Sequence, residues 1–76
     1  MKGMEKRTEL RLRNLVKMHR ARLDMTQEEL AQAVGVSRQT IHAIERGKAD
    51  PSLSLALRLA GVFELSVDEL FFMADG

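Results

Sequence analysis

Apolar residues recur every three or four positions along most of this sequence, which is the spacing of one face of an α-helix. Gly, Pro, Ser and Asp residues interrupt this pattern and divide the chain into short segments. No stretch shows the strict two-residue alternation of β-branched side chains that is typical of a strand. We therefore predict an all-α fold, a compact five-helix bundle. The expected helices span residues 8–23, 26–35, 37–47, 52–63 and 66–73.

Residues that favour helix ends stand at the boundaries of these segments. Thr26 and Glu29 have the Thr-x-x-Glu spacing of a capping box, in which side chain and backbone at a helix start bond to each other. The same spacing recurs at the start of the last segment. Gly35 and Gly47 suit the left-handed conformation that ends many helices. Pro51 disfavours helical backbone at the residue before it, so a break is expected there.

The fourth segment carries two apolar stripes on different sides. The stripe expected to face the core consists of Leu53, Ala56, Leu57, Ala60 and Phe63. The other stripe, together with apolar residues near the C-terminus, consists of Leu55, Leu59, Val62, Leu65, Phe71, Phe72 and Met73. Because a small bundle cannot easily bury two stripes, we expect the second set to contact another copy of the chain. The alternative is that all these side chains close one core.

The stretch from residue 26 to residue 47 predicts two short helices joined by a tight turn. Ile41 and Ile44 would attach the second of these helices to the core, so its opposite side would face outward. Steps of 100° per residue place four residues on that outer side, namely Gln39, His42, Ala43 and Arg46. Arg38 and Thr40 flank this face at its N-terminal end. Small and hydrogen-bonding side chains on a protruding helix suit the major groove of DNA, whose base edges present donors and acceptors.

Five motifs in this order resemble the Cro/repressor (XRE-like) family of helix-turn-helix regulators, over residues 16–71. The motifs are residues 26–31 (TQEELA), 35–41 (GVSRQTI), 44–48 (IERGK), 51–53 (PSL) and 66–71 (SVDELF). The resemblance implies a lambda-repressor-like fold that binds double-stranded DNA. It also implies a homodimer on a pseudo-palindromic operator.

The resemblance implies a role for each matching residue. Gln27, at the first position of its helix, is expected to donate to a phosphate, and the helix dipole favours an anion there. Arg38 and Gln39 are the expected base contacts, since arginine pairs with guanine and glutamine with adenine. Phosphate contact or plain solvation is the alternative for these two residues. His42 is expected either in the groove or in solvent, and Ala43 would leave room for a thymine methyl group.

Other matching residues are expected to contact the DNA backbone or to hold the fold. The expected backbone contacts are Ser37, Thr40, Arg46, Lys48 and the amides near Ser52. Ser37 is also expected to cap its helix. In the family, the arginine that matches Arg20 pairs with the glutamate that matches Glu45, so we expect a structural ion pair between them.

Four residues depart from the family pattern. Asp24 stands where glycine is common in the first turn, and aspartate tolerates such conformations. Glu64 stands where glycine is frequent after the fourth helix, which puts the end of that helix in question. His19 replaces a common leucine. Asp50 places a negative charge close to the expected phosphate contacts, where it would weaken binding.

Length and charge limit the function classes. Seventy-six residues make one domain, expected at 8–76 after a basic arm at 1–7. This arm is expected to be disordered or to extend the first helix, and an arm that touches DNA is the alternative. Residues 1–48 hold eleven of the twelve Lys and Arg but six of the eleven Asp and Glu, a net charge of +5. The remainder carries a net charge of −4. A basic half can approach a polyanion while the acidic half stays away from it. The alternative is two solvated faces of opposite sign.

Several other classes of protein are not expected. The chain has no cysteine, and two distant histidines do not suggest a metal site, so we expect neither metal nor cofactor. No apolar run is long enough for a membrane helix, and a cytoplasmic location is expected. Catalytic motifs are absent, which argues against an enzyme. The alternative function is a protein-binding module, such as an antitoxin or an adaptor that uses the apolar C-terminal surface.

Overall fold

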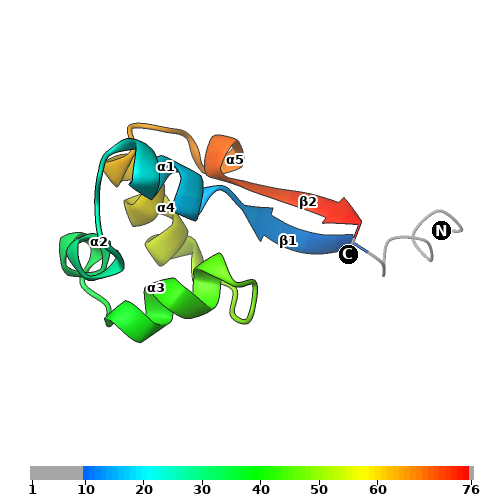
Figure 1. Ribbon diagram of the computed structural model, residues 1–76. Coiled ribbons are helices and arrows are strands. Elements are labelled where there is room, and N and C mark those ends of the chain that lie inside the picture. Colours follow the sequence, from blue (N-terminus) through cyan, green and yellow to red (C-terminus); the bar gives the residue numbers. More distant parts are fainter. Residues whose placement is uncertain (1–9, 76) are drawn as a thin grey trace, which may run out of the picture.

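The computed structural model describes residues 10–75, and the predicted arm at 1–7 lies outside this part of the chain. Each predicted helical segment contains a helix, although several are shorter than expected (Figure 1). The helices are α1 (Val16–Arg22), α2 (Gln27–Val34), α3 (Arg38–Glu45), α4 (Leu53–Val62) and α5 (Val67–Leu70).

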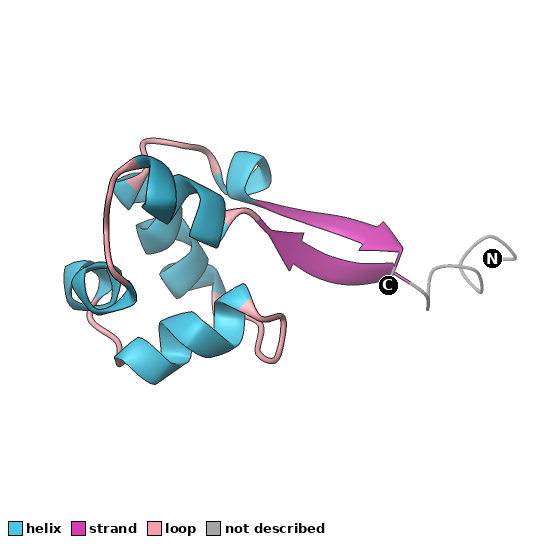
Figure 2. Cartoon of the chain, viewed as in Figure 1, coloured by secondary structure: helices cyan, strands magenta, loops and turns pink. Residues whose placement is uncertain are grey.

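A two-stranded antiparallel sheet corrects the all-α prediction. Strand β1 (Leu10–Asn14) pairs with β2 (Phe71–Asp75), and Leu10 lies opposite Asp75 while Asn14 lies opposite Phe71. The first predicted helix therefore begins only at Val16. Residues 10–13 alternate Leu and Arg, and the strand that provides their hydrogen-bond partners lies at the other end of the chain. The resulting ribbon projects away from the helices (Figure 2).

The core lies between the helices and extends to the base of the ribbon. The largest fully buried side chains are Val16, Leu30, Ile41, Ile44, Leu59 and Leu70. Helix α4 is rotated relative to the prediction. Leu53 and Leu57, expected in the core, are 72% and 56% exposed, whereas Ala56 and Ala60 are buried as expected.

The rotation of α4 also corrects the predicted contact surface between two copies. Leu55, Leu59 and Phe71 are buried within the monomer, so the prediction is wrong for these residues. Leu55 and Leu59 lie next to the small residues Ala56 and Ala60 on α4. The two bulky leucine side chains fill the core better than the alanines alone would. Val62 and Leu65 are half-buried and pack against the core. Of the predicted surface, only Phe72 and Met73 remain well exposed.

Helix ends form largely as the sequence predicts. The amide of Glu29 donates to Oγ1 of Thr26 over 3.0 Å, and the amide of Thr26 donates to Oε1 of Glu29 over 2.8 Å. Glu64 adopts a left-handed conformation with φ of 57° after α4, so the helix ends although glycine is missing. A residue with a side chain pays roughly 1 kcal/mol for this conformation.

Candidate nucleic-acid interface

Helices α2 and α3 are joined by a turn that fixes their relative orientation. Gly35 has a φ of 78°, a left-handed value that L side chains rarely adopt. The amide of Val36 donates to the carbonyl of Ala31 over 3.0 Å and closes the end of α2. The guanidinium of Arg58 on α4 donates to the carbonyl of Val34. Sequence reasoning did not identify this role of Arg58, because the two residues are far apart in sequence.

The ten residues predicted to contact DNA are all accessible. Seven are exposed, namely Ser37, Arg38, Gln39, His42, Arg46, Lys48 and Ser52. Gln27, Thr40 and Ala43 are half-buried. On the opposite side of α3, Ile41 and Ile44 are buried, so this helix has one face in the core and the other in solvent.

Gln27 connects the start of α2 to the outer face of α3. Its Nε2 donates to Oε1 of Glu45 over 3.0 Å and lies 3.3 Å from Nδ1 of His42. Its amide side chain is therefore held at the boundary between the two helices.

The expected ion pair between Arg20 and Glu45 is present and joins α1 to α3. Nε and Nη2 of the guanidinium donate to the two carboxylate oxygens over 2.8 and 3.1 Å. Nη1 donates to the carbonyl of Met25 over 2.8 Å. The side chain of Glu45 is only 4% exposed, and that of Arg20 is 15% exposed. Since two parallel hydrogen bonds fix both position and angle, this pair sets the orientation of α3.

The surroundings of Glu45 favour its charged form. Burial alone would raise the pKa of its carboxyl, but hydrogen bonds from Arg20 and Gln27 outweigh burial, so the pKa lies below its ordinary value. The pKa of the Arg20 guanidinium is raised, chiefly by its hydrogen bonds to Glu45. Both shifts indicate that the pair is fully ionised at neutral pH.

Acidification is expected to destabilise the fold through Glu45. Folding lowers the pKa of this carboxyl, so ionised Glu45 stabilises the folded state. This stabilisation is complete above the pKa of the carboxyl in the unfolded chain, about 4.3, and is lost as pH falls through its lower pKa in the folded state. The measurement is the free energy of unfolding from denaturant titrations at several acidic pH values. Glu45→Gln should flatten this dependence, and the exposed control Glu28→Gln should not. Equal pH dependence in both variants would contradict this account.

A shallow depression of about 350 Å³ lies between α1, the start of α2 and α3. It is lined by Lys17, Arg20, Gln27, Arg38, His42, Glu45 and Arg46. Arg38, His42 and Arg46 follow one another at intervals of four residues, so they form a row along α3. Sequence reasoning missed Lys17, which is exposed at the start of α1. It lies one turn before Arg20, and only the packing of α1 beside α3 reveals its position.

Two serines predicted near the DNA backbone act as helix caps. Oγ of Ser37 accepts from the amide of Thr40 over 3.2 Å, and Oγ of Ser52 accepts from the amide of Leu55 over 3.1 Å. Ser37 thus starts α3, as expected. After α3, Gly47 adopts a φ of 73°, and the amide of Lys48 donates to the carbonyl of Ala43 over 2.9 Å.

Within residues 10–75, no group of His, Asp and Glu side chains is arranged to hold a metal ion. Nor does any helix in this part of the chain have the length and apolar character that would span a membrane.

Comparison with known proteins identifies close relatives. A family model described as helix-turn-helix matches residues 16–70. The chain is 48% identical over 64 residues to the uncharacterized HTH-type transcriptional regulator MJ0272 of Methanocaldococcus jannaschii, covering 84% of this chain and 97% of the relative. It is 42% identical over 64 residues to the uncharacterized HTH-type transcriptional regulator YgzD of Bacillus subtilis, again covering 84% of this chain and 97% of the relative.

The fold also matches a solved protein–DNA complex. The P22 c2 repressor, in complex with a synthetic operator, superposes with a TM-score of 0.68 and 30% identity. The match covers 70% of this chain and 80% of the repressor chain.

Proposed function

This chain belongs to the Cro/repressor (XRE-like) family of helix-turn-helix transcriptional regulators, and we propose that it represses transcription as a homodimer bound to a pseudo-palindromic operator. Helix α3 enters the major groove, and the start of α2 contacts the backbone beside it. A twofold dimer would place two copies of α3 about 34 Å apart, one turn of DNA.

The exposed row of Arg38, His42 and Arg46 on α3 is the observation that carries this proposal. Ile41 and Ile44 attach the opposite face of the helix to the core, while Glu45 ties it to α1. A recognition helix must be held rigidly so that its side chains meet base edges at fixed positions. The P22 c2 repressor, which has a similar fold, supports this use because its structure contains an operator.

Two kinds of contact are assigned within this surface. Arg38 and Gln39, near the start of α3, read bases, and His42 and Ala43 follow them in the groove. The backbone contacts are Gln27, Ser37, Thr40, Arg46, Lys48 and the amides near Ser52. Oγ of Ser52 already accepts an amide hydrogen bond, so its hydroxyl proton remains to be donated to a phosphate. Oγ of Ser37 also lies 3.0 Å from Oγ1 of Thr40, so one of these two hydroxyls donates to the other and the second keeps its proton for a phosphate.

Arg38→Ala and Gln27→Ala are expected to affect DNA binding differently. Arg38→Ala should lower the affinity for operators that carry the preferred base at one position by about 5- to 150-fold. The reason is that one bidentate base contact discriminates between bases by about 1–3 kcal/mol. Gln27→Ala should weaken all sequences by similar factors, since a phosphate contact carries no sequence information. Binding to a panel of operators with single base changes measures both effects. If both variants shift every site alike, this division of roles is wrong.

Selection from a pool of random duplex DNA, followed by sequencing of the bound fraction, tests the proposed function. Recovery of a palindromic motif, with affinity that falls steeply as salt rises, would support a dimeric sequence-specific regulator. A single half-site would contradict the homodimer. Recovery of no motif would overturn operator binding and favour the alternative, a protein-binding module.

The surface available for a second copy differs from the predicted one. Phe72 and Met73 on β2 are 42% and 57% exposed, and Leu53 and Leu57 on α4 are more exposed than most apolar residues. Leu53, Leu57 and Phe72 are the proposed apolar contacts of the homodimer. Exposed apolar side chains commonly mark a protein contact where they gather in one contiguous patch.

A further inference from the structure

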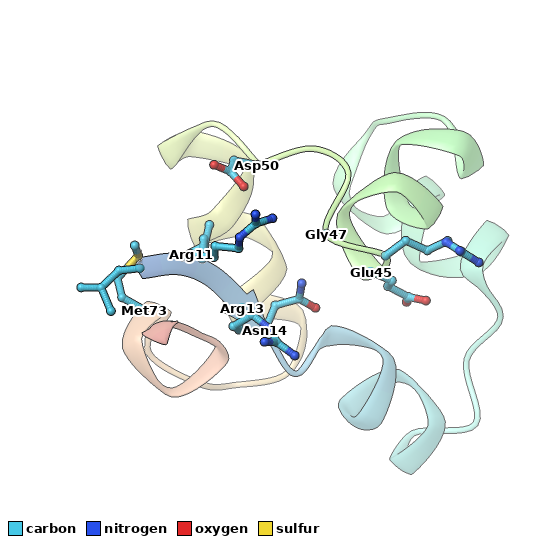
Figure 3. Close-up of a pocket in the computed structure, with 10 residues that line it drawn as sticks. Arg11, Arg13, Asn14, Glu45, Gly47, Asp50 and Met73 are labelled. Atoms are coloured by element: carbon cyan, nitrogen blue, oxygen red, sulfur yellow. The ribbon is translucent and has the colours of Figure 1, made fainter. Parts of the chain in front are cut away.

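A second, larger depression of about 780 Å³ lies beside the first and is not explained by the helix-turn-helix (Figure 3). Figure 3 shows Arg11, Arg13 and Asn14 from β1 on one side of it, and Gly47 and Asp50 from the segment after α3 on the other. Glu45 and Arg46 line both depressions. The two depressions therefore form one continuous surface that runs from α3 onto the ribbon.

The charge of this second depression is positive. Arg11 and Arg13 are exposed, and the only ion pair among residues 10–75 joins Arg20 to Glu45, so neither β1 arginine has an acidic group within 4 Å there. The charge of Glu45 is already compensated by Arg20. Asp50 is the one remaining acidic side chain in the lining, against three arginines. Such a surface attracts a polyanion.

Asn14 fixes the ribbon relative to α3. Its Nδ2 donates to the carbonyl of Ile44 over 2.9 Å, and its Oδ1 accepts from the amide of Val16 over 3.0 Å. One side chain thus connects the end of β1, the start of α1 and the last turn of α3. The two β1 arginines consequently keep a defined position relative to the recognition helix, rather than moving with a loose arm.

We propose that β1 is a second DNA-backbone site, in which Arg11 and Arg13 contact phosphates of the duplex beyond the C-terminal end of α3. This inference rests on the proposed function, since α3 must lie in the groove for the ribbon to reach the backbone. The row of Arg38, His42 and Arg46 leads directly to this site through Arg46. The continuity favours the same DNA duplex as the ligand, rather than a separate acidic protein.

The test compares Arg11→Gln/Arg13→Gln with Arg22→Gln, an exposed arginine of α1 that lines neither depression. Affinity of the full chain is measured at several salt concentrations, with a mixed-sequence duplex of about three helical turns as the probe. Each lost phosphate contact reduces the magnitude of the slope of log affinity against log salt by about 0.9. The double glutamine variant should therefore reduce this magnitude by about 1.8 per bound copy. The single control should leave this slope unchanged.

One further variant and two further measurements separate the explanations. Arg11→Lys/Arg13→Lys keeps both charges and should retain the slope. Base preference in the random-pool selection should not change in any of these variants, because backbone contacts do not read sequence. Thermal melting of each variant checks that the fold is intact.

The outcomes distinguish this inference from the proposed function. If the unchanged protein binds DNA with a palindromic preference but the double glutamine variant has the slope of the Arg22 control, the ribbon site is refuted and the proposed function stands. The same holds if the variant alters only the monomer–dimer equilibrium in sedimentation, with an unchanged slope per bound copy. If the unchanged protein binds no DNA, both are overturned.

Discussion

Leu59→Ala is expected to lower the free energy of unfolding by about 3 kcal/mol, the middle of the range for a buried leucine. Leu59 is fully buried between the helices, and its removal would leave a cavity in a small core. A domain of this length has only about 4–11 kcal/mol of stability in total. The loss corresponds to a fall of roughly 12–24 °C in Tm.

Leu57→Ala is the matched control for this prediction. It makes the same chemical change two residues earlier on α4, where the side chain is 56% exposed, and should alter stability by less than about 0.5 kcal/mol. Thermal melting at low protein concentration measures both variants as monomers. If Leu57→Ala proved the more destabilising, α4 would face the core with its other stripe, as the sequence pattern alone suggests.

Glu45→Ala is expected to destabilise the fold by about 3 kcal/mol and to weaken DNA binding as a consequence. Its removal leaves the Arg20 guanidinium without its carboxylate in a half-buried place, which costs more than the loss of an exposed ion pair. It also releases Gln27, whose side chain donates to the same carboxylate. Tm should fall by roughly 12–24 °C, and affinity should fall for all DNA sequences alike.

A double variant separates the charge from the packing. Arg20→Met/Glu45→Leu removes both charges and keeps apolar volume, so it should recover much of the lost stability. DNA affinity at a temperature where all variants are folded should stay reduced, because Gln27 has still lost its partner. An unchanged Tm in Glu45→Ala would show that the ion pair does not hold α1 against α3.

Local signals in the sequence were sufficient for the helices around the turn. The capping box of Thr26 and Glu29 and the left-handed position of Gly35 depend only on neighbours within a few residues, and the structure contains both. The accessibility of the outer face of α3 follows from the burial of Ile41 and Ile44 on the opposite face. Helical spacing alone predicts these features.

Features that depend on distant residues could not be predicted in this way. Residues 10–14 form a strand because residues 71–75 pair with them, and helical spacing of Leu12 and Leu15 indicated otherwise. On α4, both apolar stripes have the correct period, and only the packing of the other helices decides which one is buried. The positions of Lys17, Arg11 and Arg13 beside α3 likewise depend on tertiary packing.

The pairing of Leu10 with Asp75 brings the two ends of the described chain side by side. A short linker between these residues would close the chain into a ring without moving any helix, and the ring could be reopened elsewhere. Circular permutation is tolerated where ends meet at a surface and the new break lies in an exposed loop. The exposed segment at Leu23 and Asp24, which holds none of the proposed DNA contacts, meets this condition. A permuted chain that begins there would end after α1, so the same binding surface would result from a different order of helices.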